Sequence, residues 1–90
     1  MTQQLQIKGA ILDIEAKTDK NNNPYFRLCL FKVPGRYFYA FKNNLNWQIW
    51  QDLQDRPHHL VNRPVLITYQ ELPNQNNQGT FLKVQEIEIM

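Results

Sequence analysis

The sequence of 90 residues contains no serine and only one cysteine, Cys29. Without serine, every mechanism that uses a serine nucleophile is excluded, and a lone cysteine forms neither an internal disulfide nor a CxxC metal or redox motif. The three glycines are isolated from one another, so the chain has no glycine-rich loop for phosphate groups. The adjacent histidines, His58 and His59, have no acidic or cysteine partner at metal-ligand spacing. We therefore expect a non-catalytic protein with no cofactor and no metal site.

Long hydrophobic runs are also missing, since apolar runs such as residues 28–31 cover only a few residues. A helix needs about 20 such residues to cross a membrane, and the first residues form neither a basic leader nor an apolar signal segment. Together with the lone cysteine, these features predict a cytoplasmic protein that has no membrane partner. The length is typical of one small fold, so we expect a single domain over residues 1–90.

Acidic residues are missing from residues 20–51, although this segment holds half of all the lysines and arginines and most of the aromatic residues. Its cations are Lys20, Arg27, Lys32, Arg36 and Lys42, and its rings are Tyr25, Phe26, Phe31, Tyr37, Phe38, Tyr39, Phe41, Trp47 and Trp50. Cations interleaved with rings are typical of surfaces that bind single-stranded nucleic acid, because phosphates attract cations and unstacked bases stack on rings. The alternative is that several of these rings belong to the hydrophobic core.

Alternation of apolar and polar residues predicts five strands and one short helix. We expect the strands at residues 5–18, 25–31, 37–41, 65–71 and 80–90, and the helix at 45–55. The apolar residues change parity within the first strand, after Ile11, and within the last strand, near Gln85, which predicts two β-bulges. Pro34-Gly35 predicts a tight turn over residues 33–36 that joins the second and third strands into a hairpin.

Short motifs follow the same order. The chain opens with Ile7-x-Gly9-x-Ile11, Asn23-Pro24-Tyr25-Phe26-Arg27-Leu28-x-Leu30 and Tyr39-x-Phe41, and it closes with Val65-x-Ile67-x-Tyr69 and Gly79-Thr80-Phe81-Leu82-x-Val84-x-x-Ile87. This series resembles OB-fold nucleic-acid-binding proteins, in particular single-strand-binding proteins and small replication-accessory OB proteins. The resemblance implies an all-β fold, a five-stranded antiparallel barrel with one short helix between strands three and four.

OB-fold proteins bind oligonucleotides across strands two and three, which here lie in the segment without acids. In the second strand, Phe26, Leu28 and Leu30 form the more uniformly apolar set and are expected to face the core. The opposite set is expected to face outward, and it consists of Tyr25, Arg27 and Phe31, with Cys29 between them.

The third strand has two possible orientations, with Tyr37, Tyr39 and Phe41 outward or with Phe38 and Ala40 outward. The polar residues after Phe41 suit a ring that closes the core at the strand end, so we expect Phe38 to face outward and Tyr37 to contribute from the turn. The predicted nucleic-acid-binding residues are Lys20, Tyr25, Arg27, Phe31, Lys32, Arg36, Tyr37, Phe38 and Lys42.

The first functional hypothesis is non-catalytic binding of single-stranded nucleic acid with low sequence specificity, with DNA favoured over RNA as the partner. The alternative is a protein-interaction OB module that acts as a subunit or adaptor of a replication or recombination complex, in which the exposed rings form an interface. An oligosaccharide-binding OB domain would use exposed rings without requiring the cations. Small OB proteins often pair through strand edges, so a homo-oligomer is among the expected assemblies.

Overall fold

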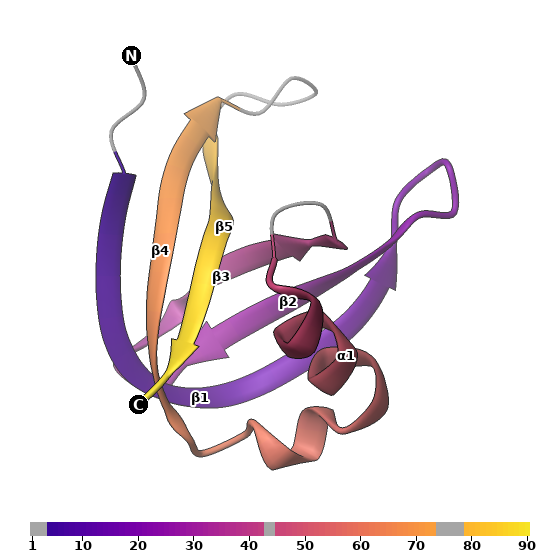
Figure 1. The fold of residues 1–90 in the computed structure, drawn as a ribbon. Coiled ribbons are helices and arrows are strands. Elements are labelled where there is room, and N and C mark those ends of the chain that lie inside the picture. The colour runs from indigo at the N-terminus through magenta and orange to yellow at the C-terminus, as the bar shows by residue number, and fades with distance from the viewer. Residues whose placement is uncertain (1–3, 43–44, 74–78) are drawn as a thin grey trace.

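The structure, a computed structural model, describes residues 4–42, 45–73 and 79–90 of the chain. Its elements, in chain order, are β1 (Gln4–Thr18), β2 (Pro24–Leu30), β3 (Val33–Phe41), α1 (Trp47–Asp55), the 3-10 helix η2 (Pro57–His59), β4 (Pro64–Pro73) and β5 (Thr80–Ile89) (Figure 1). The five predicted strands and the predicted helix between the third and fourth strands are therefore confirmed. No helix in the described ranges is long and apolar enough to cross a membrane.

The five strands form one sheet that closes in a ring, in the order β1-β2-β3-β5-β4 with β4 returning to β1. Four of the neighbouring pairs are antiparallel, but β3 and β5 run parallel and pair at Phe38 with Leu82 and at Tyr39 with Lys83. The expectation of a fully antiparallel sheet is therefore wrong. The order of the strands in the sheet requires this. β3 is linked to β1 through two antiparallel pairs, by way of β2, and β5 is linked to β1 through two antiparallel pairs, by way of β4. Both strands therefore run in the direction of β1 and are parallel to each other.

The long strand β1 belongs to both halves of the ring (Figure 1). Its first half pairs with β4 and its second half pairs with β2. The register shifts between Ile11 and Asp13, so Leu12 is the extra residue of a bulge. In β5 the register shifts opposite Thr68 and Tyr69, where Gln85 is the extra residue. Both predicted bulges are confirmed. Each bulge lets its strand, β1 or β5, bend more strongly, which helps the sheet to close.

Asn46 caps the start of helix α1, and its side chain accepts a hydrogen bond of 2.8 Å from the backbone N–H of Gln48. The helix buries Ile49, Trp50 and Leu53 on one face, as the sequence spacing predicts. The Trp50 ring meets the Phe26 ring edge-on, with centroids 5.1 Å apart, so the helix packs against the inner side of β2. Residues 74–78, between β4 and β5 in the sequence, lie outside the described residues.

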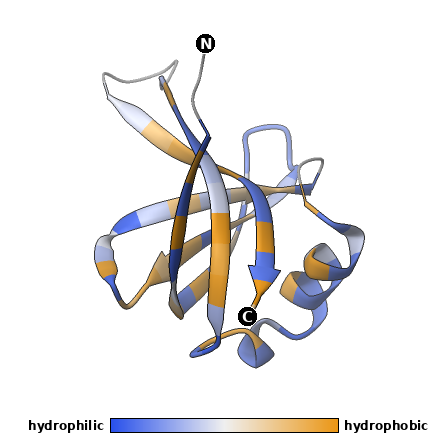
Figure 2. Ribbon diagram, turned by 60° about the vertical axis from the view of Figure 1, so that its left-hand side comes forward, coloured by the Kyte–Doolittle hydropathy of each residue, from blue (hydrophilic) through white to orange (hydrophobic). Residues whose placement is uncertain are grey.

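The core fills the inside of the ring, and the strands alternate between apolar and polar residues accordingly (Figure 2). On β2, Phe26, Leu28 and Leu30 are buried as predicted. On β3, Phe38 is only 1% exposed and its ring packs edge-on against the Tyr69 ring at 5.2 Å. The prediction that Phe38 faces outward is therefore wrong. Phe38 pairs with Leu28, and because residues directly opposite one another share a face of the sheet, both side chains enter the core.

The connection between β2 and β3 also differs from the prediction. Leu30 pairs with Val33, so the turn consists of Phe31 and Lys32 and not of residues 33–36. The next pair in the register is Cys29 with Tyr37, which leaves residues 34–36 as an extended bulge in β3. The Cys29 thiol donates a hydrogen bond of 3.1 Å to the carbonyl oxygen of Pro34, so the bulge covers Cys29 and buries it.

Candidate functional site

The outer side of the sheet carries five aromatic rings from three neighbouring strands. We call this set the outer aromatic face, and it consists of Tyr25 from β2, Tyr37, Tyr39 and Phe41 from β3, and Phe81 from β5. Since Phe38 and Ala40 point into the core, the alternate residues of β3 must point outward. Tyr37 is 39% exposed, and the other four rings are half-buried. Each ring therefore leaves part of its surface accessible to a ligand.

Four of these rings form a continuous row across the strands. The Tyr25 ring lies 5.4 Å from the Phe41 ring and 6.0 Å from the Tyr39 ring, measured between centroids. The row continues onto β5, where the Phe81 ring meets the Tyr39 ring nearly edge-on at 6.0 Å. These tilted and edge-on arrangements are the ones that aromatic pairs prefer, so the rings hold one another in place without a ligand.

Arg27 lies on the same face of β2 but is already paired. Its Nη2 atom lies 2.7 Å from Oε2 of Glu15, and its guanidinium lies over the Tyr37 ring, 4.2 Å from the centroid. The hydrogen bond from Arg27 lowers the pKa of Glu15, and the same bond raises the pKa of Arg27. Lys17 also approaches Glu15, at 3.6 Å. Arg27 therefore contacts Glu15 and the Tyr37 ring, and it is not the free phosphate-binding cation that the sequence predicts.

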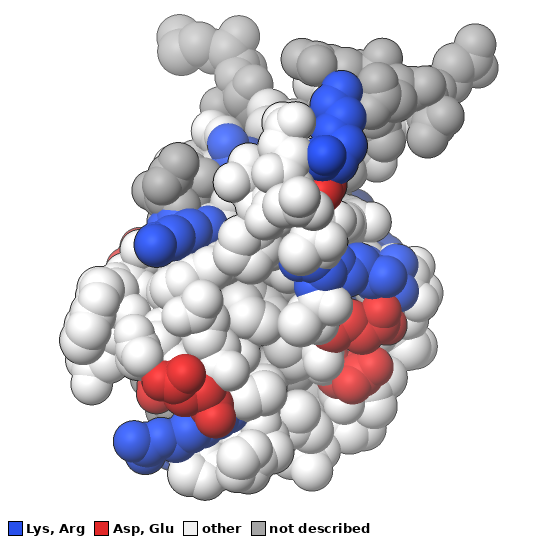
Figure 3. Space-filling view, turned by 90° about the vertical axis from the view of Figure 1, so that its right-hand side faces the viewer, with Lys and Arg blue, Asp and Glu red and all other residues white. Residues whose placement is uncertain are grey.

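Other basic side chains of the segment without acids are free, and two of them, Arg36 and Lys42, lie beside the outer aromatic face. Lys20, Lys32, Arg36 and Lys42 are exposed and make no ion pair within the part of the chain that the structure describes. Lys83 of β5 places its Nζ atom 5.9 Å from the centroid of the Phe41 ring. Figure 3 shows a face of the molecule where basic side chains are spaced over a largely uncharged surface and the acidic ones adjoin basic ones. Free positive charge and ring surface thus lie close together.

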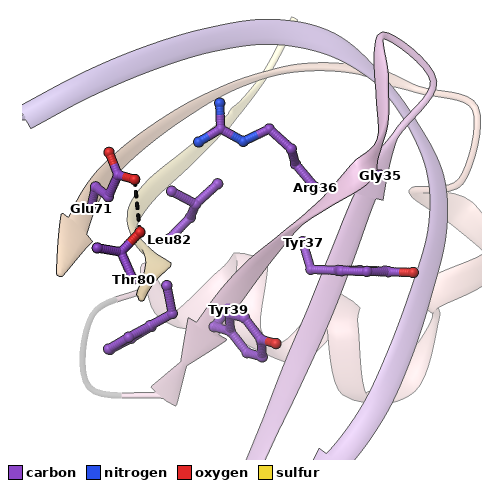
Figure 4. Close-up of a pocket in the computed structure, with 8 residues that line it drawn as sticks. Gly35, Arg36, Tyr37, Tyr39, Glu71, Thr80 and Leu82 are labelled. Carbon is purple, nitrogen blue, oxygen red and sulfur yellow. Dashed lines mark hydrogen bonds between the residues drawn. The ribbon is translucent and has the colours of Figure 1, made fainter. Parts of the chain in front are cut away.

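Two hollows adjoin the outer aromatic face. The first, which we call the rim groove, has a volume of about 310 Å³ and is lined by Gly35, Arg36, Tyr37, Tyr39, Glu71, Thr80, Phe81 and Leu82 (Figure 4). The second, which we call the turn groove, has a volume of about 320 Å³ and is lined by Asp19, Asn23, Pro24, Phe41 and Lys42. Each groove shares rings with the row and contains one of the free cations.

The turn between β1 and β2, which forms one wall of the turn groove, is held by Asp19. Its Oδ1 atom accepts hydrogen bonds from the backbone N–H groups of Asn21 and Asn23, at 2.8 and 2.9 Å. These bonds, the one from Asn23 above all, lower the pKa of Asp19. Asn22 adopts a positive φ of 65°, which asparagine tolerates better than most residues. The loop that carries Lys20 is therefore organised by its own side chains.

The structure brings some of the predicted site residues together and separates others. Tyr25 and Tyr37 lie on the outer aromatic face, while Arg36 and Lys42 line the two grooves. Phe31 is 51% exposed, as predicted, but it lies in the β2–β3 turn beside Lys32 and makes no ring contact with the described residues. Phe38 belongs to the core and drops out of the site. Four residues were missed, namely Tyr39, Phe41, Phe81 and Lys83.

Cys29, His58 and His59 are the remaining chemically active side chains considered in the sequence. Cys29 is buried, and this burial raises the pKa of its thiol, which keeps it protonated and unreactive at neutral pH. His58 and His59 are exposed on η2, with ring centroids 4.4 Å apart. Within residues 4–42, 45–73 and 79–90, no group of three histidine, cysteine or acidic side chains could hold a metal ion.

Comparison of the chain with protein-family models, with curated proteins and with solved structures gave no match. The functional argument therefore rests on the outer aromatic face, its two grooves and the cations around them. Such an arrangement offers flat π-surfaces for stacking and positive charge for anionic groups.

Proposed function

We propose that this protein binds single-stranded nucleic acid on the outer aromatic face, without catalysis and with low sequence specificity. The observation that carries the proposal is the row of Phe41, Tyr25, Tyr39 and Phe81, which are in ring contact across three strands and remain partly open to solvent. Soluble proteins normally bury such rings, so a row of this length on the surface indicates a ligand with flat apolar faces.

The chemistry of a single strand matches this surface. Its unstacked bases expose π-faces, and each base that stacks on an aromatic side chain contributes about 1–3 kcal/mol. Its phosphates require cations, which Arg36, Lys42 and Lys83 supply beside the rings. Duplex DNA would not fit this role, because its bases are already stacked on one another and hidden from a flat protein surface.

The topology supports the same proposal. A three-stranded meander, a helix and a closing hairpin, with β3 and β5 in parallel contact, resemble the five-stranded OB fold. OB folds bind oligonucleotides on strands two and three and on the loops that join strands one to two and four to five. The outer aromatic face lies on β2 and β3 and extends to β5. The turn groove and the rim groove lie beside the β1–β2 turn and the β4–β5 hairpin, respectively.

The second candidate is a protein-interaction module of a replication or recombination complex. Trp47, the first residue of α1, favours this candidate because it is 75% exposed and makes no ring contact with any described residue. Exposed tryptophan is a frequent anchor of protein interfaces. Both functions are compatible, because Trp47 is not part of the outer aromatic face.

Titration of fluorescently labelled oligothymidine and oligouridine of about 12 nucleotides, at two salt concentrations, tests the proposal. We expect binding that weakens as salt increases, with the DNA oligomer bound more tightly than the RNA oligomer. The Tyr39→Ala variant should weaken binding, and the matched control Trp47→Ala, which removes another accessible ring, should not. Absence of binding at micromolar protein in low salt would overturn the proposal and favour the interaction module.

A further inference from the structure

The rim groove has two chemically different parts. Tyr39 and Phe81 supply aromatic surface, whereas Arg36, Glu71 and Thr80 supply polar groups. In Figure 4, Arg36 reaches from β3 toward the side of the groove where Glu71 and Thr80 lie, and Tyr37 projects to the other side of the strand. At about 310 Å³ the groove is at the small end of ligand pockets and is large enough for one base.

The carboxylate of Glu71 is held in position but is not neutralised. The Thr80 hydroxyl donates a hydrogen bond of 2.8 Å to Oε1 of Glu71, while Glu71 makes no ion pair with the residues that the structure describes. Arg36 of β3, which also lines the groove, is exposed and likewise makes no ion pair with the described residues. The Glu71 carboxylate, an acceptor, and the Arg36 guanidinium, a donor, thus line the same groove without forming an ion pair with each other.

We propose that the rim groove is a subsite for one base of the bound strand and that it selects bases that carry an exocyclic amino group. This inference rests on the proposed function and adds a preference at one position of the bound strand. Glu71 accepts a hydrogen bond from the amino group, as carboxylates do from N4 of cytosine, and Arg36 donates to an acceptor on the same base. Thymine and uracil present a carbonyl oxygen in place of the amino group, and the carboxylate repels it.

Cytosine and uracil provide the sharpest test, because they differ only in the group at C4 and in the hydrogen on the adjacent N3. We expect oligodeoxycytidine of about 12 nucleotides to bind about fivefold more tightly than oligodeoxyuridine of the same length. Oligothymidine should behave like oligodeoxyuridine, which excludes an effect of the thymine methyl group. In the Glu71→Ala variant the ratio of the two affinities should fall to about one.

The control variant Glu88→Ala removes the same charge from an exposed position of β5 outside the rim groove. Glu88→Ala should raise the affinity for every oligomer slightly, because it removes a negative charge, and it should leave the ratio unchanged. Glu71→Ala should instead lower the affinity for oligodeoxycytidine, which loses a hydrogen bond, and raise the affinity for oligodeoxyuridine. If Glu71→Ala folds poorly, Arg36→Ala is the substitute, and it should lower both the overall affinity and the ratio.

Two outcomes would overturn the inference in distinguishable ways. Equal affinities for oligodeoxycytidine and oligodeoxyuridine in the unmodified protein, or a ratio that survives both Glu71→Ala and Arg36→Ala, would refute the subsite and leave the proposed function intact. Failure of the unmodified protein to bind any of the three oligomers would refute the proposed function and the subsite together.

Discussion

The two sides of β3 carry similar residues and have different surroundings. On the inner side, Phe38 and Ala40 are completely enclosed, and the Phe38 ring contacts Tyr69 of β4. On the outer side, Tyr37, Tyr39 and Phe41 keep part of their ring surface in solvent. Composition does not separate the two sides, because aromatic residues occur on both.

Ring contact alone does not separate them either. The Phe38–Tyr69 contact inside the ring of strands and the Tyr39–Tyr25 contact outside have similar centroid distances, 5.2 and 6.0 Å. The difference is burial, since the inner rings are covered by protein and the outer rings are covered only in part. We infer that the inner rings stabilise the fold, whereas the outer rings retain free π-surface for a ligand.

The largest expected effect is on the inner side. Replacing Phe38 by alanine leaves a cavity in the core and should lower the free energy of unfolding by about 3–5 kcal/mol. Tyr39→Ala, one position along the strand, should lower it by less, because this side chain already contacts solvent. Chemical denaturation of both variants measures the difference. Equal losses would mean that the two sides of β3 do not differ in the way described.

The next effect is on the outer side. Tyr39→Ala should weaken oligonucleotide binding by about 1–3 kcal/mol, because Tyr39 contacts both Tyr25 and Phe81 and its loss interrupts the row of rings. Fluorescence anisotropy with a labelled oligomer measures this loss. Phe31→Ala is an informative companion, since Phe31 is exposed but lies outside the row. A larger loss for Phe31→Ala than for Tyr39→Ala would move the binding surface to the β2–β3 turn.

A smaller effect distinguishes free cations from paired ones. Replacing Arg36 and Lys42 together by alanine removes one cation from each groove and should flatten the slope of log affinity against log salt by about 1.4, at about 0.7 for each phosphate contact. Replacing Arg56 and Arg63, which lie between α1 and β4, should leave the slope unchanged. Similar changes for the two double variants would show that the position of a cation does not matter.

The smallest effect concerns the ion pair between Arg27 and Glu15. Because the hydrogen bond from Arg27 lowers the pKa of Glu15 in the folded protein, this pair stabilises the fold above the ordinary carboxyl pKa. The stabilisation is lost as the pH falls through the lowered pKa. The difference in melting temperature between the unmodified protein and Glu15→Gln should therefore be small at neutral pH and vanish in acid. A difference that does not change with pH would contradict this assignment.

Much of the fold could be predicted from the sequence, because apolar alternation records which side of each strand is buried. The five strands, the helix and both bulges followed from that alternation and from its changes of parity. The orientation of β3 could not be predicted in this way, because aromatic residues occupy both its odd-numbered and its even-numbered positions. Pro34-Gly35 favoured a turn at residues 33–36, but the chain turns at Phe31 and Lys32. The register that places Phe38 opposite Leu28 could therefore not be predicted from the sequence.

The errors in the predicted site also come from strand pairing that the sequence pattern does not reveal. Phe81 and Lys83 reach the outer aromatic face only because β5 closes the sheet in parallel against β3, whereas the resemblance to OB folds implied an antiparallel sheet. Arg27 was predicted to be a free cation, yet the register of β1 and β2 places it opposite Glu15, twelve residues earlier in the chain. Contacts of this kind depend on strand register, which local patterns of apolar residues do not specify.

The most direct test of the central claim is a titration followed by nuclear magnetic resonance. Addition of unlabelled oligothymidine to isotopically labelled protein should shift the backbone amide signals of Tyr25, Tyr39, Phe41 and Phe81 first, and the signals of α1 should stay in place. Shifts concentrated on α1 around Trp47, with no change on β2, β3 and β5, would contradict the claim that the outer aromatic face binds nucleic acid.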